Sequence, residues 1–325
     1  MRAVMHHQFG DPAEVLTVEE IPVTEPGAGE VRVRTILSPI HNHDLWTIRG
    51  TYGFTPVLPA RTGTEAVGVI DAIGSDVVGL SVGQRVATGG TFGVWAEYFI
   101  GKAAAMIPVD DTVSDEVAAQ LVAMPFSAIS LLEFLSLKKG DWIVQNAANG
   151  AVGRLVAQLA VARGINVVGL VRRSAGVGEL AEQGIGNVVA TDTEDWAERV
   201  RAIVGDAPIV AGVDSVGGDA SGEVLSLLAE NATLVVFGAM QSPMMQIGSG
   251  DIIFKQITVR GFWGSKVSSA MPAAQRGALF AELIERIGDG VLTLPVAATY
   301  SFEDVTSAAR ANFEPGRVGK IMLRP

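Results

Sequence analysis

The chain has 325 residues, a formal net charge of −11 and no cysteine. An acidic balance argues against nucleic acid or an anionic membrane surface as a partner, and a chain without cysteine has neither disulfide bonds nor thiolate ligands for zinc. No apolar run approaches the ~18 residues of a membrane span. The sequence opens directly into strand-like residues, Arg2–Met5, rather than into a charged and then apolar leader, so we expect a cytoplasmic protein.

The length and the pattern predict two domains with different architectures. Residues 1–118 are β-rich, because short apolar runs such as Val31–Leu37 and Gly68–Ile73 alternate with Gly/Pro turns. This pattern indicates a compact, barrel-like domain.

From residue 119 the period changes to helix-like stretches that alternate with short apolar runs. The runs lie at 141–147, 165–171, 187–190, 209–213, 233–237 and 257–262. Such alternation is typical of an α/β, doubly wound parallel sheet, which we predict over 119–264. The remaining segment, 265–325, contains a predicted helix and a final strand, and we expect it to return to the first domain.

The turn that follows the first of these runs has the residues of a pyrophosphate site. Small residues at Ala147, Gly150 and Gly153 let the backbone turn sharply, let a phosphate approach and let a helix pack on the strand. The free N–H groups of the helix start, which includes Ala151 and Val152, then face the anion. We therefore predict that this turn binds a dinucleotide, with Asn146 and Ala147 contributing at its start; Ala147 replaces the first glycine of the usual fingerprint.

The next predicted strand, 165–171, ends at Arg172-Arg173-Ser174. A chain that binds NAD usually places Asp or Glu there for the ribose 2′-hydroxyl, whereas two arginines and a serine suit a 2′-phosphate. The sequence thus favours NADPH over NADH. The alternative interpretation is an exposed basic loop.

Glycine patterns before the nucleotide fold suggest a family. Gly63-Thr64-Glu65-Ala66-Val67-Gly68 is followed by Gly74-Ser75 and by Gly83-Gln84-Arg85-Val86. In this order the chain resembles the medium-chain dehydrogenase/reductase superfamily. The resemblance implies a GroES-like catalytic domain with an inserted Rossmann domain, and a homodimer that joins two Rossmann sheets near Ile257–Gly261.

The superfamily has zinc and zinc-free branches, and this chain is similar to the zinc-free one. His41 and Thr64-Glu65 stand where zinc members carry a cysteine and a His-Glu pair, and a catalytic zinc normally needs three aligned protein ligands. We therefore expect no metal. Glu65 is interpreted as a structural acceptor inside its domain, and the residues His41 and His43 as lining a cleft or bonding locally.

Within the zinc-free branch are quinone reductases and 2-enoyl thioester reductases. Gly50-Thr51-Tyr52-Gly53, followed by Pro56 and Leu58-Pro59, resembles the segment that bears the catalytic tyrosine of the enoyl reductases. The resemblance implies a catalytic role for Tyr52, the alternative being a tyrosine packed at a loop end. His41 stands where both groups commonly have asparagine, and we hypothesise that it donates a hydrogen bond to a substrate carbonyl or to a ribose hydroxyl.

Three further segments are candidates for the cofactor site. Gly238-Ala239-Met240 ends an apolar strand, where backbone can reach a nicotinamide. Phe262-Trp263 is a candidate wall of the ring, with core or dimer packing as the alternative, and Lys320 resembles a cofactor-side lysine of the family, with an exposed strand charge as the alternative. Asp192 and Asp214 are interpreted as turn or cap residues.

The functional hypothesis is an NADPH-dependent reductase of activated C=C bonds in 2-enoyl thioesters or related enones. A neutral phenol such as that of Tyr52 is a suitable donor to the developing enolate, since its reference pKa is about 10. Two alternatives stay open: an NADPH:quinone oxidoreductase, and a non-catalytic NADPH-binding sensor or structural protein.

Overall fold

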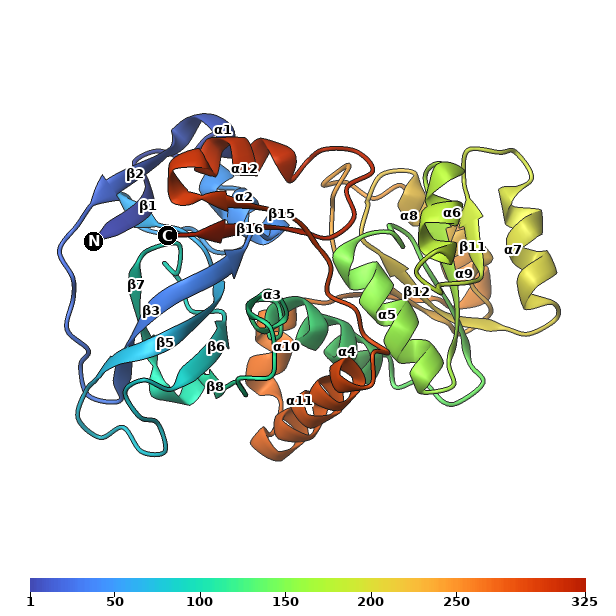
Figure 1. The fold of residues 1–325 in the computed structure, drawn as a ribbon. Helices are drawn as coiled ribbons and strands as arrows, with labels where there is room; N and C mark the ends of the chain where they lie inside the picture. Colours follow the sequence, from blue (N-terminus) through green and yellow to red (C-terminus); the bar gives the residue numbers. More distant parts are fainter. The chain divides into compact units, whose positions relative to one another are not determined.

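The computed structural model describes residues 1–325, and the chain divides into two compact units (Figure 1). The first unit comprises Met1–Ala123 and Leu294–Pro325, and the second comprises Met124–Thr293. The return to the first unit begins later than the expected residue 265, because the helix α11 (Ala273–Gly288) packs within the second unit. Arg163 binds both carboxylate oxygens of Glu282 at 3.0 and 2.8 Å, which holds α11 in that unit.

The first unit is mostly β-structure, as predicted. Its strands are β1 (Arg2–His6), β2 (Leu16–Glu20), β3 (Glu30–Pro39), β4 (Ala60–Arg61), β5 (Glu65–Ile73), β6 (Arg85–Gly89), β7 (Tyr98–Lys102), β8 (Ile107–Pro108), β15 (Val296–Ser301) and β16 (Lys320–Arg324). Its helices are α1 (Pro12–Val15), α2 (Asn42–Arg49), η1 (Ala103–Ala105), α3 (Asp115–Ala118), η2 (Phe302–Asp304) and α12 (Val305–Ala311).

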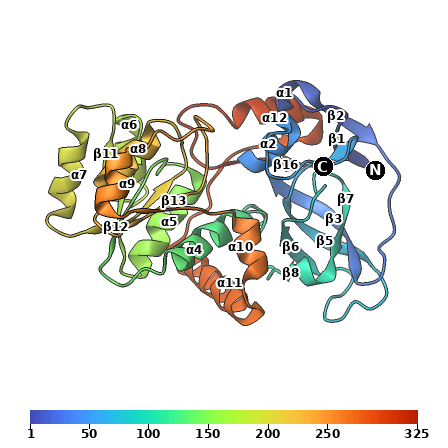
Figure 2. The ribbon, with the colours of Figure 1, turned by 180° about the vertical axis from the view of Figure 1, so that it is seen from behind.

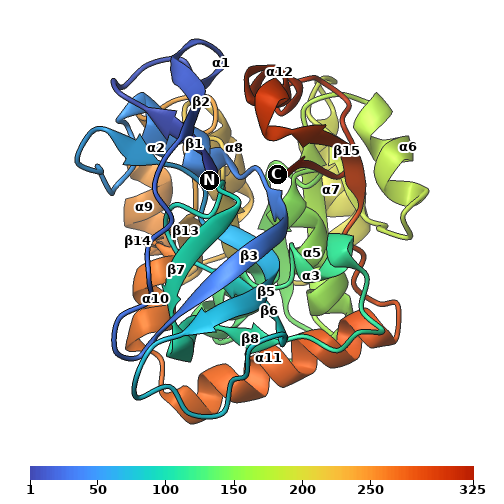
Figure 3. The ribbon, with the colours of Figure 1, turned by 60° about the vertical axis from the view of Figure 1, so that its left-hand side comes forward.

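The long strand β3 organises this unit (Figure 3). It pairs antiparallel with β5, β7 and the carboxyl-terminal β16, within a sheet of order β15-β16-β3-β5-β6-β8. Alternate residues of β3, including Val31 and Val33, are buried in a core that also contains Trp95 and Phe302. Because Met322 pairs with Pro39, the last strand lies beside the segment that leads from β3 into α2.

The second unit is a parallel sheet with helices on both faces. It contains α4 (Ala123–Leu135), β9 (Trp142–Gln145), α5 (Ala151–Ala162), β10 (Asn166–Val171), α6 (Ala175–Ala181), β11 (Val188–Ala190), α7 (Trp196–Val204), β12 (Ile209–Asp214), α8 (Ala220–Leu227), β13 (Thr233–Val236), α9 (Ser249–Lys255), β14 (Thr258–Gly261), α10 (Gly264–Ala270) and α11. Figures 1 and 2 show α5 and α9 on opposite faces of this sheet.

The strand order of this sheet is β11-β10-β9-β12-β13-β14, with every neighbouring pair parallel. Numbered within the unit, this is the order 3-2-1-4-5-6 of a doubly wound dinucleotide-binding fold, so the predicted fold class is confirmed. Each of the six apolar runs overlaps one of the six strands. The strands β9 to β13 are largely buried, as parallel strands usually are, whereas all four residues of the edge strand β14 are exposed. None of the helices combines the length and apolar composition that a bilayer crossing requires.

Candidate functional site

The switch point of the second unit lies between β9 and β12, where loops leave the sheet in opposite directions. The turn after β9 is tight: the N–H of Gly150 donates to the carbonyl of Ala147 at 2.8 Å, and Gly150 is the N-cap of α5. Ala151, Val152 and Gly153 form the first turn of α5, whose N–H groups have no partner inside the helix and can bind an anion. Ala147 has a φ of 48°, the left-handed conformation that explains why glycine is usual there.

Gly153 is required by close packing of α5 on this turn. A Cβ atom at Gly153 would lie 2.7 Å from the carbonyl oxygen of Ala147 and 2.9 Å from the Cα of Ala148. Both are backbone atoms, which cannot move away without distorting the turn.

The side chain of Asn146 joins the ends of β9 and β12. Its Nδ2 donates to Asp214 Oδ1 at 2.6 Å, and its Oδ1 accepts from the N–H of Ser215 at 2.7 Å. Buried Asp214 also accepts from the N–H groups of Val216 and Gly217, so it is a turn acceptor, as interpreted from the sequence. Asn146 therefore shapes the loops around residues 147–150, the predicted phosphate turn, and its own contact with the cofactor stays a prediction.

Arg172, Arg173 and Ser174 follow β10 and are all exposed. The N–H and hydroxyl of Ser174 donate to the two carboxylate oxygens of Asp192, each at 2.8 Å. These bonds hold the pKa of Asp192 below its usual range. The loop that carries the arginine pair is thereby fixed at the carboxyl end of β10, next to β9.

Gly238, Ala239 and Met240 follow β13 at the same edge of the sheet. The N–H of Gly238 donates to Asp214 O at 3.2 Å, and that of Met240 donates to Ser215 O at 3.1 Å. The loops after β9, β10, β12 and β13 therefore form one continuous edge.

The aromatic pair after β14 has two environments. Phe262 is buried, and its ring lies 5.7 Å from that of Phe237 and 5.4 Å from that of Phe134. Trp263 is 45% exposed and is the N-cap of α10. Phe262 thus takes part in core packing, the alternative raised from the sequence.

In the first unit, Tyr52 lies in the loop that follows α2. Gly50 ends this helix with a φ of 73°, and the N–H groups of Gly50 and Thr51 bind the last carbonyls of α2, each at 3.0 Å. The ring of the partly buried Tyr52 lies 5.8 Å from that of His43, centroid to centroid. The helix end therefore determines where Tyr52 is held.

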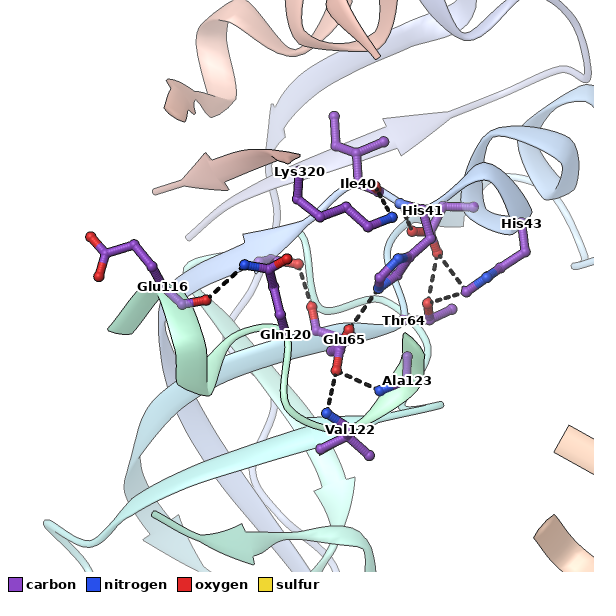
Figure 4. A network of polar contacts seen from close by, with 12 residues as sticks. Ile40, His41, His43, Thr64, Glu65, Glu116, Gln120, Val122, Ala123 and Lys320 are labelled. Carbon is purple, nitrogen blue, oxygen red and sulfur yellow. Dashed lines mark hydrogen bonds and ion pairs between the residues drawn. The ribbon is translucent and has the colours of Figure 1, made fainter. Parts of the chain in front are cut away.

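His41 and Glu65 form a buried pair in this unit (Figure 4). His41 Nε2 lies 2.7 Å from Glu65 Oε2, while Oε1 of Glu65 accepts from the N–H groups of Val122 at 2.7 Å and Ala123 at 2.6 Å. Burial raises the pKa of Glu65 to about 8, although both N–H bonds lower it. Burial also holds the pKa of His41 well below its usual value. At neutral pH the pair is therefore uncharged, and Glu65 is the structural acceptor that the sequence indicated.

Lys320 is buried, so it is not the exposed strand charge that was the alternative. Its Nζ donates to the carbonyl of Ile40 at 3.2 Å, because β16 lies beside β3 and brings Lys320 next to the start of α2 (Figure 4).

Asp44 and Thr64 belong to the same polar network and were not selected from the sequence. Thr64 Oγ1 donates to Asp44 Oδ1 at 2.7 Å, and the N–H of His41 donates to Asp44 Oδ2 at 2.9 Å. The spacing of Asp44, three residues after the helix N-cap His41, is a helix-start signal that points to this role. No group of three or more His, Cys, Asp or Glu side chains is arranged to hold a metal ion.

Comparison with known proteins agrees with both units. The model of the alcohol dehydrogenase GroES-like domain matches residues 27–111, and that of zinc-binding dehydrogenases matches residues 151–278. The human mitochondrial enoyl-[acyl-carrier-protein] reductase is 31% identical over 99% of this chain and 88% of its own length. The chain belongs to the medium-chain dehydrogenase/reductase superfamily. The resemblance found in the sequence is confirmed, and so is the combination of a GroES-like and a Rossmann domain.

Other similar proteins are named either enoyl-[acyl-carrier-protein] reductase or quinone oxidoreductase. The mitochondrial enoyl-[acyl-carrier-protein] reductase of Arabidopsis thaliana is 34% identical over 81% of this chain and 72% of its own length. The solved structure of Escherichia coli quinone oxidoreductase, complexed with NADPH, is 25% identical, with a TM-score of 0.90 and full coverage of both chains. The protein is therefore an oxidoreductase.

We predict that Gly153→Ala lowers the free energy of unfolding by about 1–3 kcal/mol, because the new methyl group meets backbone atoms of the turn. Gly178→Ala is the matched control, since Gly178 lies in α6 with nothing within 4 Å of its added Cβ. There, alanine should stabilise the helix by about 0.5–1 kcal/mol. Urea denaturation measures both, and an equal response of the two variants would contradict the packing.

We predict that Glu65 makes stability fall as pH rises. Between its ordinary pKa of 4.5 and its folded value of about 8, the folded chain keeps a proton that the unfolded chain releases. From pH 6.5 to pH 8, the wild type should lose about 1–2 kcal/mol relative to Glu65→Gln, which cannot titrate. Below about pH 6.5, His41 has the opposite effect on stability. Its pKa is lowered in the folded chain, so the unfolded chain takes up a proton that the folded chain does not, and stability falls as the pH falls.

Urea denaturation at several pH values tests this dependence. Glu19→Gln is the control, because Glu19 also lies 2.7 Å from a histidine, His7, but at the surface. Parallel stability curves for the wild type and Glu65→Gln would show that Glu65 is ionised throughout.

Proposed function

We propose that the protein is an NADPH-dependent reductase of activated C=C bonds, with 2-enoyl thioesters or related enones as substrates. The similarity to enoyl-[acyl-carrier-protein] reductases over nearly the whole chain carries this proposal. The position of Tyr52, at the capped end of α2, supports it.

The residues at the carboxyl edge of the Rossmann sheet fit the cofactor. The N–H groups of Ala151, Val152 and Gly153 would bind the pyrophosphate, and Arg172 and Arg173 the 2′-phosphate. When bound, NADPH supplies the hydride that adds to the β-carbon of the substrate. We further propose contacts to the cofactor from Asn146, Ala147, Gly150, Ser174, Gly238, Ala239, Met240, Phe262, Trp263 and Lys320.

The acceptor needs a donor to its carbonyl oxygen. Negative charge develops there as an enolate, and Tyr52 stabilises it by donating a hydrogen bond from its phenol; the same group can supply the proton. His41 is the second proposed catalytic residue. Its ring stacks on that of His43, which in turn lies beside the ring of Tyr52.

A quinone is the second candidate acceptor. The close structural similarity to the E. coli quinone oxidoreductase favours it, since that protein has the same fold over its full length.

We also propose a homodimer through β14. This strand is the edge of the Rossmann sheet, and all four of its residues are exposed. Nearby on α9, Phe254 is 82% exposed and Ile253 is 57% exposed. Edge strands with apolar neighbours are usually covered, and a second copy would pair with β14 and bury these side chains.

We expect the wild type to oxidise NADPH with crotonyl-CoA, and Tyr52→Phe to lower kcat/KM about 100-fold, because loss of an oxyanion donor costs about 10²–10³. Steady-state absorbance of NADPH measures this, with a simple ortho-quinone as the second acceptor. Turnover of the quinone alone, unaffected by Tyr52→Phe, would replace the enoyl proposal by the quinone one.

We expect Arg172→Ala/Arg173→Ala to raise the Kd for NADPH about 100-fold and to change that for NADH less than about 3-fold. Each lost charged hydrogen bond to the 2′-phosphate is worth about 1.5–3 kcal/mol. Fluorescence titration gives both constants, and Arg201→Ala is the control, because Arg201 is an exposed arginine on α7. An unchanged preference for NADPH would place the 2′-phosphate elsewhere.

A further inference from the structure

The ring of His43 lies between two others in the first unit. Its centroid is 5.0 Å from that of His41, with planes inclined by 18°, and 5.8 Å from that of Tyr52, inclined by 31°. His43 is in the first turn of α2 and Tyr52 lies just beyond its last residue. The imidazole thus lies between the ring of His41 and the phenol ring of Tyr52.

A chain of hydrogen bonds fixes this imidazole. The single hydroxyl proton of Thr64 is used on Asp44 Oδ1, at 2.7 Å. Thr64 Oγ1 can therefore only accept in its 2.7 Å contact with His43 Nε2, which must carry a proton. Asp44 is buried, and its other oxygen accepts from the N–H of His41. Thr64, held by Asp44, therefore sets both the ring orientation and the tautomer of His43. Figure 4 shows the contact between His43 and Thr64.

The imidazole is also held neutral. Burial lowers the pKa of His43, and of the two charged groups that face it, Asp44 raises this pKa whereas Lys320 lowers it. A neutral ring of fixed orientation packs against Tyr52 without adding a charge beside its phenol.

We propose that His43 is a positioning residue that, tethered by Asp44 and Thr64, holds the ring of Tyr52 in place for hydrogen bonding to the substrate. This proposal rests on the role of Tyr52 in the proposed function. It assigns a role to Thr64, whose hydroxyl lies 2.7 Å from His43 Nε2.

Thr64→Val tests the tether, because valine keeps the shape of threonine and removes both hydrogen bonds. With crotonyl-CoA, Thr64→Val should lower kcat about 10- to 100-fold, the usual effect of misplacing a reacting group by about 1 Å, with KM changed less than about 3-fold. Thr64→Ser, which keeps the hydroxyl, should retain kcat within about 3-fold. His43→Phe keeps a ring without the tether and should behave like Thr64→Val.

A double-mutant cycle with Tyr52→Phe separates positioning from general damage. If His43 acts through Tyr52, Thr64→Val has no further effect on kcat once the phenol is absent. Additive losses in the cycle, or an unchanged kcat of Thr64→Val, would overturn the proposal.

An NMR measurement without substrate keeps this test independent of the enzyme's activity. The chain has three tyrosines, so ¹³C-labelled tyrosine rings give few signals, and Tyr52→Phe assigns the relevant one. Thr64→Val should shift the Tyr52 signals and leave those of Tyr98 and Tyr300, whereas Thr64→Ser should shift none. Unmoved Tyr52 signals in Thr64→Val overturn the inference, whereas a wild type that is inactive with crotonyl-CoA but shows the expected shifts contradicts only the proposed substrate.

Discussion

The buried carboxyl group of Glu65 is the constraint on which the polar network of the first unit depends. A carboxylate inside a protein is costly unless its oxygens are hydrogen-bonded, and here both are, to two backbone N–H groups and to His41. Burial still dominates, so Glu65 stays protonated near neutral pH and His41 stays uncharged. The formal charges that remain nearby are those of Asp44 and Lys320, which are opposite in sign.

In the second unit, the order of the strands determines which loops can bond to one another. Because β9 and β12 are neighbours, Asn146 after one strand can bond to Asp214 and Ser215 after the other. The backbone of Gly238 and Met240 then bonds to the same loop. The phosphate turn is thus built into a set of mutually bonded loops, and its shape is set by the chain itself. Such a preformed site spends little binding energy on ordering.

The sequence predicts some of these features and not others, for physical reasons. The strands β9 to β13 of the Rossmann sheet are visible as apolar runs because they are largely buried, and the predicted phosphate turn is visible because it needs small residues. The extent of the second unit is not visible in the sequence. The amphipathic pattern of α11 shows that one of its faces is buried, but not which unit it packs against. Likewise, the sequence leaves open whether Lys320 is a cofactor-side lysine or an exposed strand charge, and only the position of its strand beside β3 excludes the exposed charge.

Local sequence patterns do not predict the pairing of His41 with Glu65 either, because this pairing depends on the register of β5 against β3. That register is fixed by Gly68, where an added Cβ would lie 2.4 Å from the carbonyl oxygen of Arg34, so that only glycine fits opposite Thr35. A slip by one residue would turn the side chain of Glu65 to the other face of the sheet. It would also break the bond from Ser38 Oγ to the carbonyl of Glu65, at 2.5 Å. Gly68, which has no side chain, therefore helps to determine where the proton of the buried Glu65 is held.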